Sequence, residues 1–163
     1  MHQLSPMVRS ALFVADLKKS EQFYRNVLGL VDVWYEGELS DGNAHRLLGV
    51  PASSFTKAKI LKAEGPAWGM VGLFEVSNPT LPARSIDLKQ INLGETCLVF
   101  YSTDLDQVQQ ALEAGGHHIV CQPLLLSVDG KDRQREMTFR DPDGVLINLI
   151  EWDPSNETRP EQK

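Results

Sequence analysis

The sequence predicts an α+β fold of two tandem βαβββ modules, and three observations support this prediction. The first is an internal repeat in which Asp16 and Asp104, 88 positions apart, each follow a strand-like segment and open an amphipathic helix. The second is the order of the hydrophobic patterns, which gives a strand, a helix and then three strands in each half. The third is the turn sequence Asp141-Pro142-Asp143-Gly144, directly before an almost wholly apolar run.

The composition indicates a globular protein that neither binds nucleic acid nor spans a membrane. The 163 residues are 42% hydrophobic and carry a net charge of −6, whereas non-specific nucleic-acid binding needs basic patches. No signal-peptide pattern lies near the N-terminus, and no apolar stretch approaches the length of a membrane span. With two cysteines, Cys97 and Cys121, we expect a cytoplasmic protein with reduced thiols, a disulfide being the less favoured alternative.

Residues 1–77 are predicted to form the first module. Asp16 is a good N-cap for a helix over 17–28, whose apolar positions have helical spacing. An insert at 38–56, with a short helix expected over 44–48, makes this module the longer one. Its strands are expected over 8–15, 31–35, 56–63 and 68–76.

Residues 78–95 show little periodicity and contain proline and glycine, so we expect a linker there. Residues 96–152 are predicted to form the second module, with Asp104 as the N-cap of its helix, and 153–163 a disordered tail. A break is expected at Gln122-Pro123. The strands of the second module are expected over 97–101, over 118–121 and 124–128 on the two sides of this break, which count as one strand of the repeat, and over 135–140 and 145–150.

Short motifs add a family resemblance to this repeat. They are the Asp-Leu pair after each first strand, the Ser20…Phe23-Tyr24…Leu28-Gly29-Leu30 helix pattern, and Asp141-Pro142-Asp143-Gly144. Over roughly residues 8–152 the sequence resembles the vicinal oxygen chelate superfamily, the glyoxalase, bleomycin-resistance protein and extradiol dioxygenase group. The resemblance implies curved mixed sheets around a shared pocket for a small molecule, often in a homodimer. It also implies a divalent metal that chelates neighbouring substrate oxygens in many members, while others only bind ligands.

The metal ligands of that family lie on the first and last strands of each module. Carried over to this sequence, those positions are Arg9, Glu75, Cys97 and Asn148. Arginine cannot ligate a cation, asparagine is a weak oxygen ligand and cysteine is a soft one, which leaves Glu75 as the one good general ligand. The resemblance therefore implies a degenerate or altered metal site, with a divalent metal doubtful. We expect Arg9 and Glu75 to form an ion pair in its place.

Strand parity supports a ligand-binding face on which most side chains are apolar and a few are polar. Arg9 and Phe13 share one face of the first strand, and the same count places Cys97 with Tyr101 and sets Asn148 inside the last strand. Structural alternatives remain open for each polar residue. Cys97 could be an inert core thiol, and Asn148 could tie down a neighbouring backbone segment. Arg9 and Glu75 could both lie in solvent.

Two functions are compatible with these residues. The first is a small-molecule enzyme of the lyase or dioxygenase type, with Glu75 as base or metal ligand. Its substrate contacts would be Arg9, Phe13, Cys97, Tyr101, Asn148 and, from the insert, His45. The alternative is a metal-free small-molecule-binding protein that resembles the bleomycin-resistance proteins. The sequence names no substrate and no cofactor.

Overall fold

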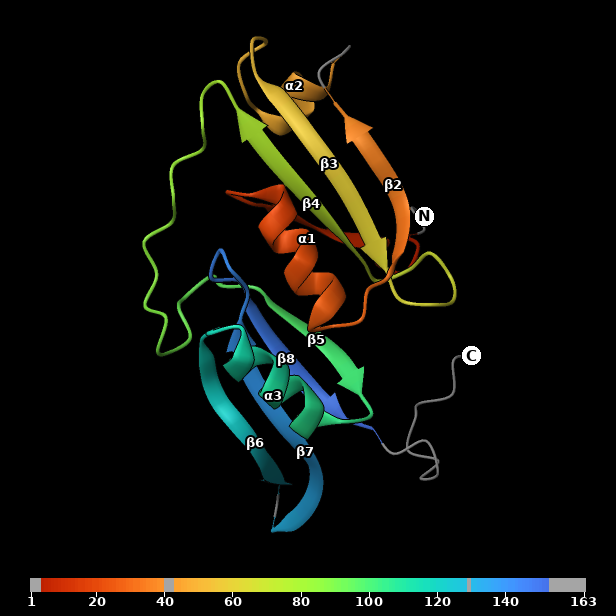
Figure 1. The fold of residues 1–163 in the computed structure, drawn as a ribbon, viewed down its shortest axis with the longest axis vertical. Helices are drawn as coiled ribbons and strands as arrows, with labels where there is room; N and C mark the ends of the chain where they lie inside the picture. Colours follow the sequence, from red (N-terminus) through yellow and green to blue (C-terminus); the bar gives the residue numbers. More distant parts are fainter. Residues whose placement is uncertain (1–3, 40–42, 129, 153–163) are drawn as a thin grey trace. The chain divides into compact units, whose positions relative to one another are not determined.

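The computed structural model describes residues 4–39, 43–128 and 130–152, so the predicted disordered tail at 153–163 lies outside the described residues. The chain divides into two compact units between Arg84 and Ser85, and we describe each unit by itself. Each unit is one βαβββ module with a four-stranded mixed sheet, as Figure 1 shows. The predicted α+β class with two tandem modules is therefore confirmed, while the shared pocket stays a prediction.

The two modules have the same topology. The elements of the first are β1 (Arg9–Phe13), α1 (Leu17–Asn26), β2 (Asp32–Glu38), α2 (Ala44–Leu48), β3 (Phe55–Lys62) and β4 (Met70–Ser77). Those of the second are β5 (Cys97–Ser102), α3 (Leu105–Ala114), β6 (Ile119–Val128), β7 (Lys131–Arg140) and β8 (Leu146–Glu151). The strand orders are β1-β4-β3-β2 and β5-β8-β7-β6, with the first two strands of each order parallel. None of the helices in the described ranges is both long and apolar enough to cross a membrane.

Both long helices begin at the predicted aspartates. Asp16 Oδ1 accepts a hydrogen bond from the Lys19 N–H at 2.9 Å, and Asp104 Oδ1 accepts one from the Gln107 N–H at 2.9 Å. Each carboxylate thus satisfies an N–H group that lacks a partner inside the helix. The repeat seen in the sequence is therefore a repeat of helix caps.

Each sheet packs one face against its own helix. α1 packs on β3 and β4, and α3 packs on β6 and β7. The fully buried apolar side chains between helix and sheet include Tyr24, Leu61, Leu73, Leu105, Leu112, Phe139, Ile147 and Leu149. On the opposite face of each sheet, Phe13, Val99 and Tyr101 are exposed, whereas Ala58, Ile60 and Phe74 of the first sheet are buried.

The predicted break at Gln122-Pro123 is wrong, because β6 continues through it from Ile119 to Val128. β6 is the edge strand of its sheet, where proline is tolerated because one side of the strand needs no partner. The pairing of β6 with β7 slips between Cys121 and Leu124, which absorbs the missing N–H of Pro123.

The turn before β8 is built by one carboxylate. Asp141 Oδ1 accepts hydrogen bonds from the N–H groups of Asp143 at 2.9 Å and Val145 at 2.8 Å. Gly144 has φ of +88°, a conformation that a side chain would strain. The turn therefore fixes where β8 begins, and with it the register of the last strand.

Candidate functional site

The register of the first sheet separates two residues that the sequence placed together. β1 pairs with β4 so that Arg9 lies opposite Met70, and Phe13 lies opposite Phe74. Neighbours in register share a face, so Glu75 lies on the other face, toward α1. The expected common face of Arg9 and Glu75, and the ion pair built on it, are therefore wrong. The Asp-Pro-Asp-Gly motif that precedes β8 is not repeated before β4, and a slip of one residue moves every side chain to the opposite face.

Glu75 instead holds the beginning of α1. Its Oε2 atom accepts a hydrogen bond from the Leu17 N–H at 2.7 Å. This contact joins β4 to the helix that covers it, and it places a carboxylate at the positive end of the helix dipole.

Glu75 also lines an open pocket of about 510 Å³ on the α1 side of the first sheet. The pocket is strongly charged, but its buried charge is matched within the protein. The Lys59 ammonium lies 2.8 Å from Glu21 and 3.0 Å from Glu36. Burial acts to lower the pKa of Lys59, but the hydrogen bonds to Glu21 and Glu36 outweigh it and raise the pKa. These contacts are those of a structural ion-pair network under the helix.

We predict that Glu75→Ala destabilises the first unit. The lost contact is a charge-assisted bond at a helix terminus, so the free energy of unfolding should fall by about 1–2 kcal/mol. Urea denaturation measures this loss. Asp16→Ala, which removes the neighbouring cap, is the matched control and should cost about 1 kcal/mol. Unchanged stability of Glu75→Ala would contradict the structural role of Glu75.

On the second sheet, side chains from β5, β8, β7 and β6 form rows on the face opposite α3. One row runs Tyr101, Ile150, Glu136 and Leu124, and the next runs Val99, Asn148, Thr138 and Cys121. We call this surface, with Cys97 beside it, the second open face. Tyr101 and Val99 are 51% and 56% exposed, so a molecule in solution can reach their side chains.

Asn148 stands at the centre of the second open face and binds the side chains around it. Its Nδ2 atom donates to Glu136 Oε2 at 3.2 Å, to the Met137 carbonyl at 3.3 Å and to Thr138 Oγ1 at 3.3 Å. Gln134 Nε2 donates to the other oxygen of Glu136 at 2.9 Å. The half-buried Glu136 is thus held between two amides, with acceptor capacity remaining on its carboxylate.

Cys97 lies at the end of this face as an exposed free thiol. Partial burial of its sulfur raises the pKa, and the charge of Glu95 acts in the same direction. A hydrogen bond from the Asn148 backbone and the charge of Arg140 act against the rise without cancelling it. The raised pKa keeps the thiol protonated at neutral pH, which disfavours it as a nucleophile.

The internal repeat identifies the residue that corresponds to Asn148 in the first unit. Asn148 pairs with Val99, and the residue 88 positions before Val99 is Ala11, which pairs with Gly72. A Cβ atom on Gly72 would lie 2.8 Å from the Phe74 ring and 3.5 Å from Arg9 Cδ. Arg9 and Phe74 thus fill the space over a position that has no side chain.

The family's metal does not fit these residues. The corrected set is Arg9, Gly72, Cys97 and Asn148, which offers a cation, no side chain, a protonated thiol and an amide. No three of the described His, Cys, Asp and Glu side chains are grouped so that they could hold a metal ion. Glu75, the predicted metal ligand, lies on the α1 face of its sheet.

The other predicted contacts are spread over both units. Phe13, 48% exposed, lies on the open side of the first sheet, where its ring contacts Phe74 with centroids 5.9 Å apart. His45 is half-buried in α2, the short helix of the insert. The structure brings Cys97, Tyr101 and Asn148 together on one sheet. Glu136 was not among the contacts predicted from the sequence.

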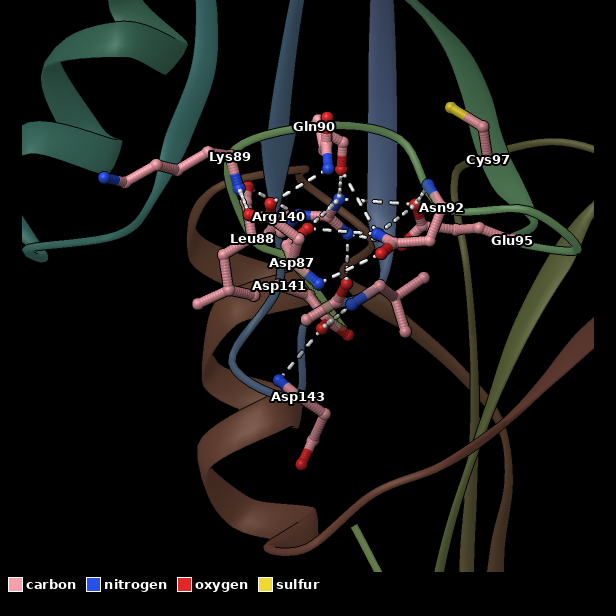
Figure 2. Close-up of polar contacts among 12 residues, drawn as sticks. Asp87, Leu88, Lys89, Gln90, Asn92, Glu95, Cys97, Arg140, Asp141 and Asp143 are labelled. Atoms are coloured by element: carbon pink, nitrogen blue, oxygen red, sulfur yellow. Dashed lines mark hydrogen bonds and ion pairs between the residues drawn. The ribbon is translucent and has the colours of Figure 1, made fainter. Parts of the chain in front are cut away.

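A buried arginine fixes the frame of the second open face. Arg140, 1% exposed, forms an ion pair with Glu95, whose side chain is 5% exposed. Its guanidinium also donates to the carbonyls of Gln90 at 2.6 Å, Gly144 at 2.7 Å and Leu88 at 3.0 Å. Figure 2 shows the segment with Leu88, Gln90 and Glu95 arching over Arg140, just before Cys97 opens β5. Residues 85–95, predicted to be linker, thus belong to the second unit and anchor the start of β5.

Comparisons with known proteins agree with this fold. A family model described as Glyoxalase/Bleomycin resistance protein/Dioxygenase superfamily matches residues 6–149. A glyoxalase family protein from Bacillus cereus is 17% identical, with a TM-score of 0.71 over 92% of this chain and 95% of that one. A glyoxylase/bleomycin resistance protein/dioxygenase domain from Frankia sp. is 19% identical, with a TM-score of 0.59 over 93% and 95%.

A glyoxalase I mutant from Zea mays is 17% identical, with a TM-score of 0.64 over 90% of this chain and 44% of that one. At these identities the solved structures show the fold alone. No curated protein sequence matches the chain.

Proposed function

The chain belongs to the glyoxalase/bleomycin resistance protein/dioxygenase superfamily, and we propose that it binds a small organic molecule on the second open face without a chelated metal. The observation that carries this proposal is the residue set at the family's metal positions. Arg9 and Gly72 contribute no ligand atom, and Asn148 contributes only a weak amide oxygen.

The composition of the second open face supports binding. Small-molecule sites combine an apolar surface with a few fixed polar groups that orient the ligand. Val99, Tyr101 and Ile150 supply the apolar part, and Glu136 with Asn148 supplies the polar part. Because its amide nitrogen points to Glu136, the Asn148 carbonyl oxygen is the atom that it can offer to a bound donor.

A small-molecule screen followed by two-dimensional NMR tests this proposal. We expect ligands that shift the resonances of Val99, Thr138 and the Asn148 side-chain amide, with the same dissociation constant with and without EDTA. Asn148→Ala should weaken the binding of these ligands, whereas Asp106→Asn, at an exposed position of α3, should not. Binding that disappears with EDTA and returns with one equivalent of zinc or manganese would refute metal-free binding.

The enzyme alternative is favoured by one specific observation, the half-buried carboxylate of Glu136 on the second open face. A carboxylate within reach of a bound molecule can take a proton from it. Turnover lost in Glu136→Gln with ligand binding retained would establish the enzyme, and a bound ligand recovered unchanged would favour simple binding. Three further features stay predictions, namely lyase or dioxygenase chemistry, the homodimer and the cytoplasmic location. Sedimentation equilibrium checks the homodimer.

A further inference from the structure

We propose that the ligand of the second open face is an organic cation, with a protonated amine or amidine bound by Glu136 and an apolar body lying on Ile150 and Tyr101. This inference rests on the proposed function and adds the chemical class of the ligand.

The first step is the charge on the face. In the two rows of the second open face, Glu136 is the charged residue. Arg140 stands in the neighbouring row with Leu146 and Cys97, but it is 1% exposed and neutralised by Glu95. Among the ion pairs of the described residues, none joins a lysine or arginine to Glu136. These two rows of described side chains therefore offer one negative charge that a ligand can match. The net charge of −6 also favours the approach of cations.

The second step is the rigidity of this carboxylate. Asn148 holds Oε2 and Gln134 holds Oε1, and both donors come from strands of the same sheet. Two donors leave lone pairs on both oxygens, since an ionised carboxylate has about four acceptor sites. A group fixed before binding loses little side-chain entropy when the ligand arrives.

The third step is the distance between the polar and aromatic groups. Tyr101, Ile150 and Glu136 stand in one row on β5, β8 and β7. Adjacent strands are about 4.8 Å apart, so the backbones of β5 and β7 lie roughly 10 Å apart along this row. That length suits one or two rings with a short cationic arm. The half-exposed Tyr101 ring provides a face for the apolar body.

The fourth step is a comparison with the other module. The row that corresponds by the 88-residue repeat is Phe13, Phe74 and Ala58, which carries no charge. Likewise, Gly72 and Ile60 stand where the second module has Asn148 and Thr138. The fold therefore does not require a carboxylate at this point of the sheet. Its presence in the second module, with two amides around it, points to a ligand.

Three probes with the same apolar body test the inference, namely 2-naphthylmethylamine, 2-naphthalenemethanol and 2-naphthoate. NMR titrations would follow the Asn148 and Gln134 side-chain amides in the full chain at pH 7. We expect the amine to bind at least about tenfold more tightly than the alcohol, and the carboxylate least tightly. Glu136→Gln should abolish the preference for the amine. Asp106→Asn, which removes one carboxylate from an exposed position of α3, should retain the preference for the amine.

The outcomes separate the inference from the function on which it rests. Equal affinities for the amine and the alcohol, or a preference for the amine that survives Glu136→Gln, would refute the inference that the ligand is a cation bound by Glu136. Binding on this face would remain possible. If none of the three probes shifts these resonances and a broad screen also finds no ligand, both proposals fail. A Glu136→Gln spectrum that matches the parent elsewhere confirms that the variant is folded.

Discussion

Replacing Arg140 by methionine is expected to lower the free energy of unfolding by about 3–5 kcal/mol, the cost of breaking a buried ion pair from one side. The substitution removes the cation that pairs with Glu95, whose side chain is 5% exposed. It also removes the donor for the carbonyls of Leu88, Gln90 and Gly144. Urea denaturation of the purified variant measures the loss.

Arg135 supplies the matched control, because it lies on the same strand as Arg140 and forms ion pairs of its own, with two carboxylates. Its partners are Asp106 at 2.6 Å and Glu151 at 3.1 Å, but the Asp106 side chain is 64% exposed. Arg135→Met should therefore cost much less stability than Arg140→Met. Equal losses for Arg140→Met and Arg135→Met would contradict the argument from burial. The double variant Glu95→Gln/Arg140→Met should recover part of the loss, because no unpaired charge remains.

The same ion pair predicts how stability depends on pH. The hydrogen bond from Arg140 lowers the pKa of Glu95 from 4.5 to about 2, against the opposing effect of burial. Because the folded-state pKa is the lower one, this stabilisation is complete above pH 4.5 and is lost as the pH falls toward 2. The difference in stability between the parent and Glu95→Gln/Arg140→Met should shrink across that window.

The fold could be predicted because its signals are local and repeated. Asp16 and Asp104 cap helices through bonds that span three residues, and Asp141 builds a turn that spans four. Each of these contacts depends on neighbours in the sequence, so the residue pattern alone reveals it. The continuation of β6 through Pro123 could not be predicted, because the edge position that tolerates it is a property of the sheet.

The candidate site could be predicted only where the sequence fixes the strand register. Gly144 marks the start of β8, so Asn148 was placed on the right face with Cys97 and Tyr101. No Asp-Pro-Asp-Gly turn marks the start of β4. Counting along the sequence therefore placed the family's ligand position at Glu75, whereas the strand register places it at Gly72.

Glu136 was missed because it lies in a run of charged residues. The alternation within that run, with Gln134, Glu136 and Thr138 facing away from α3 while Met137 and Phe139 are buried, is the signal that could have found it.

Asp141→Ala is expected to lower the free energy of unfolding by about 2–4 kcal/mol, because one buried carboxylate oxygen serves two backbone N–H groups. Asp141 is 5% exposed, so water cannot readily replace its bonds to Asp143 and Val145. Asp104→Ala is the control, since its exposed carboxylate serves one N–H at 2.9 Å and should cost about 1 kcal/mol. Urea denaturation compares the two.

Asp141→Asn should restore most of the stability that Asp141→Ala loses, because the amide keeps an oxygen that can accept both bonds. The turn also sets the register of β8, so the Asn148 side-chain amide resonances should move in Asp141→Ala and return in Asp141→Asn. Unchanged Asn148 resonances in a destabilised Asp141→Ala would show that β8 keeps its register without the turn. The strand pairing with β5 and β7 would then be what positions Asn148 beside Glu136.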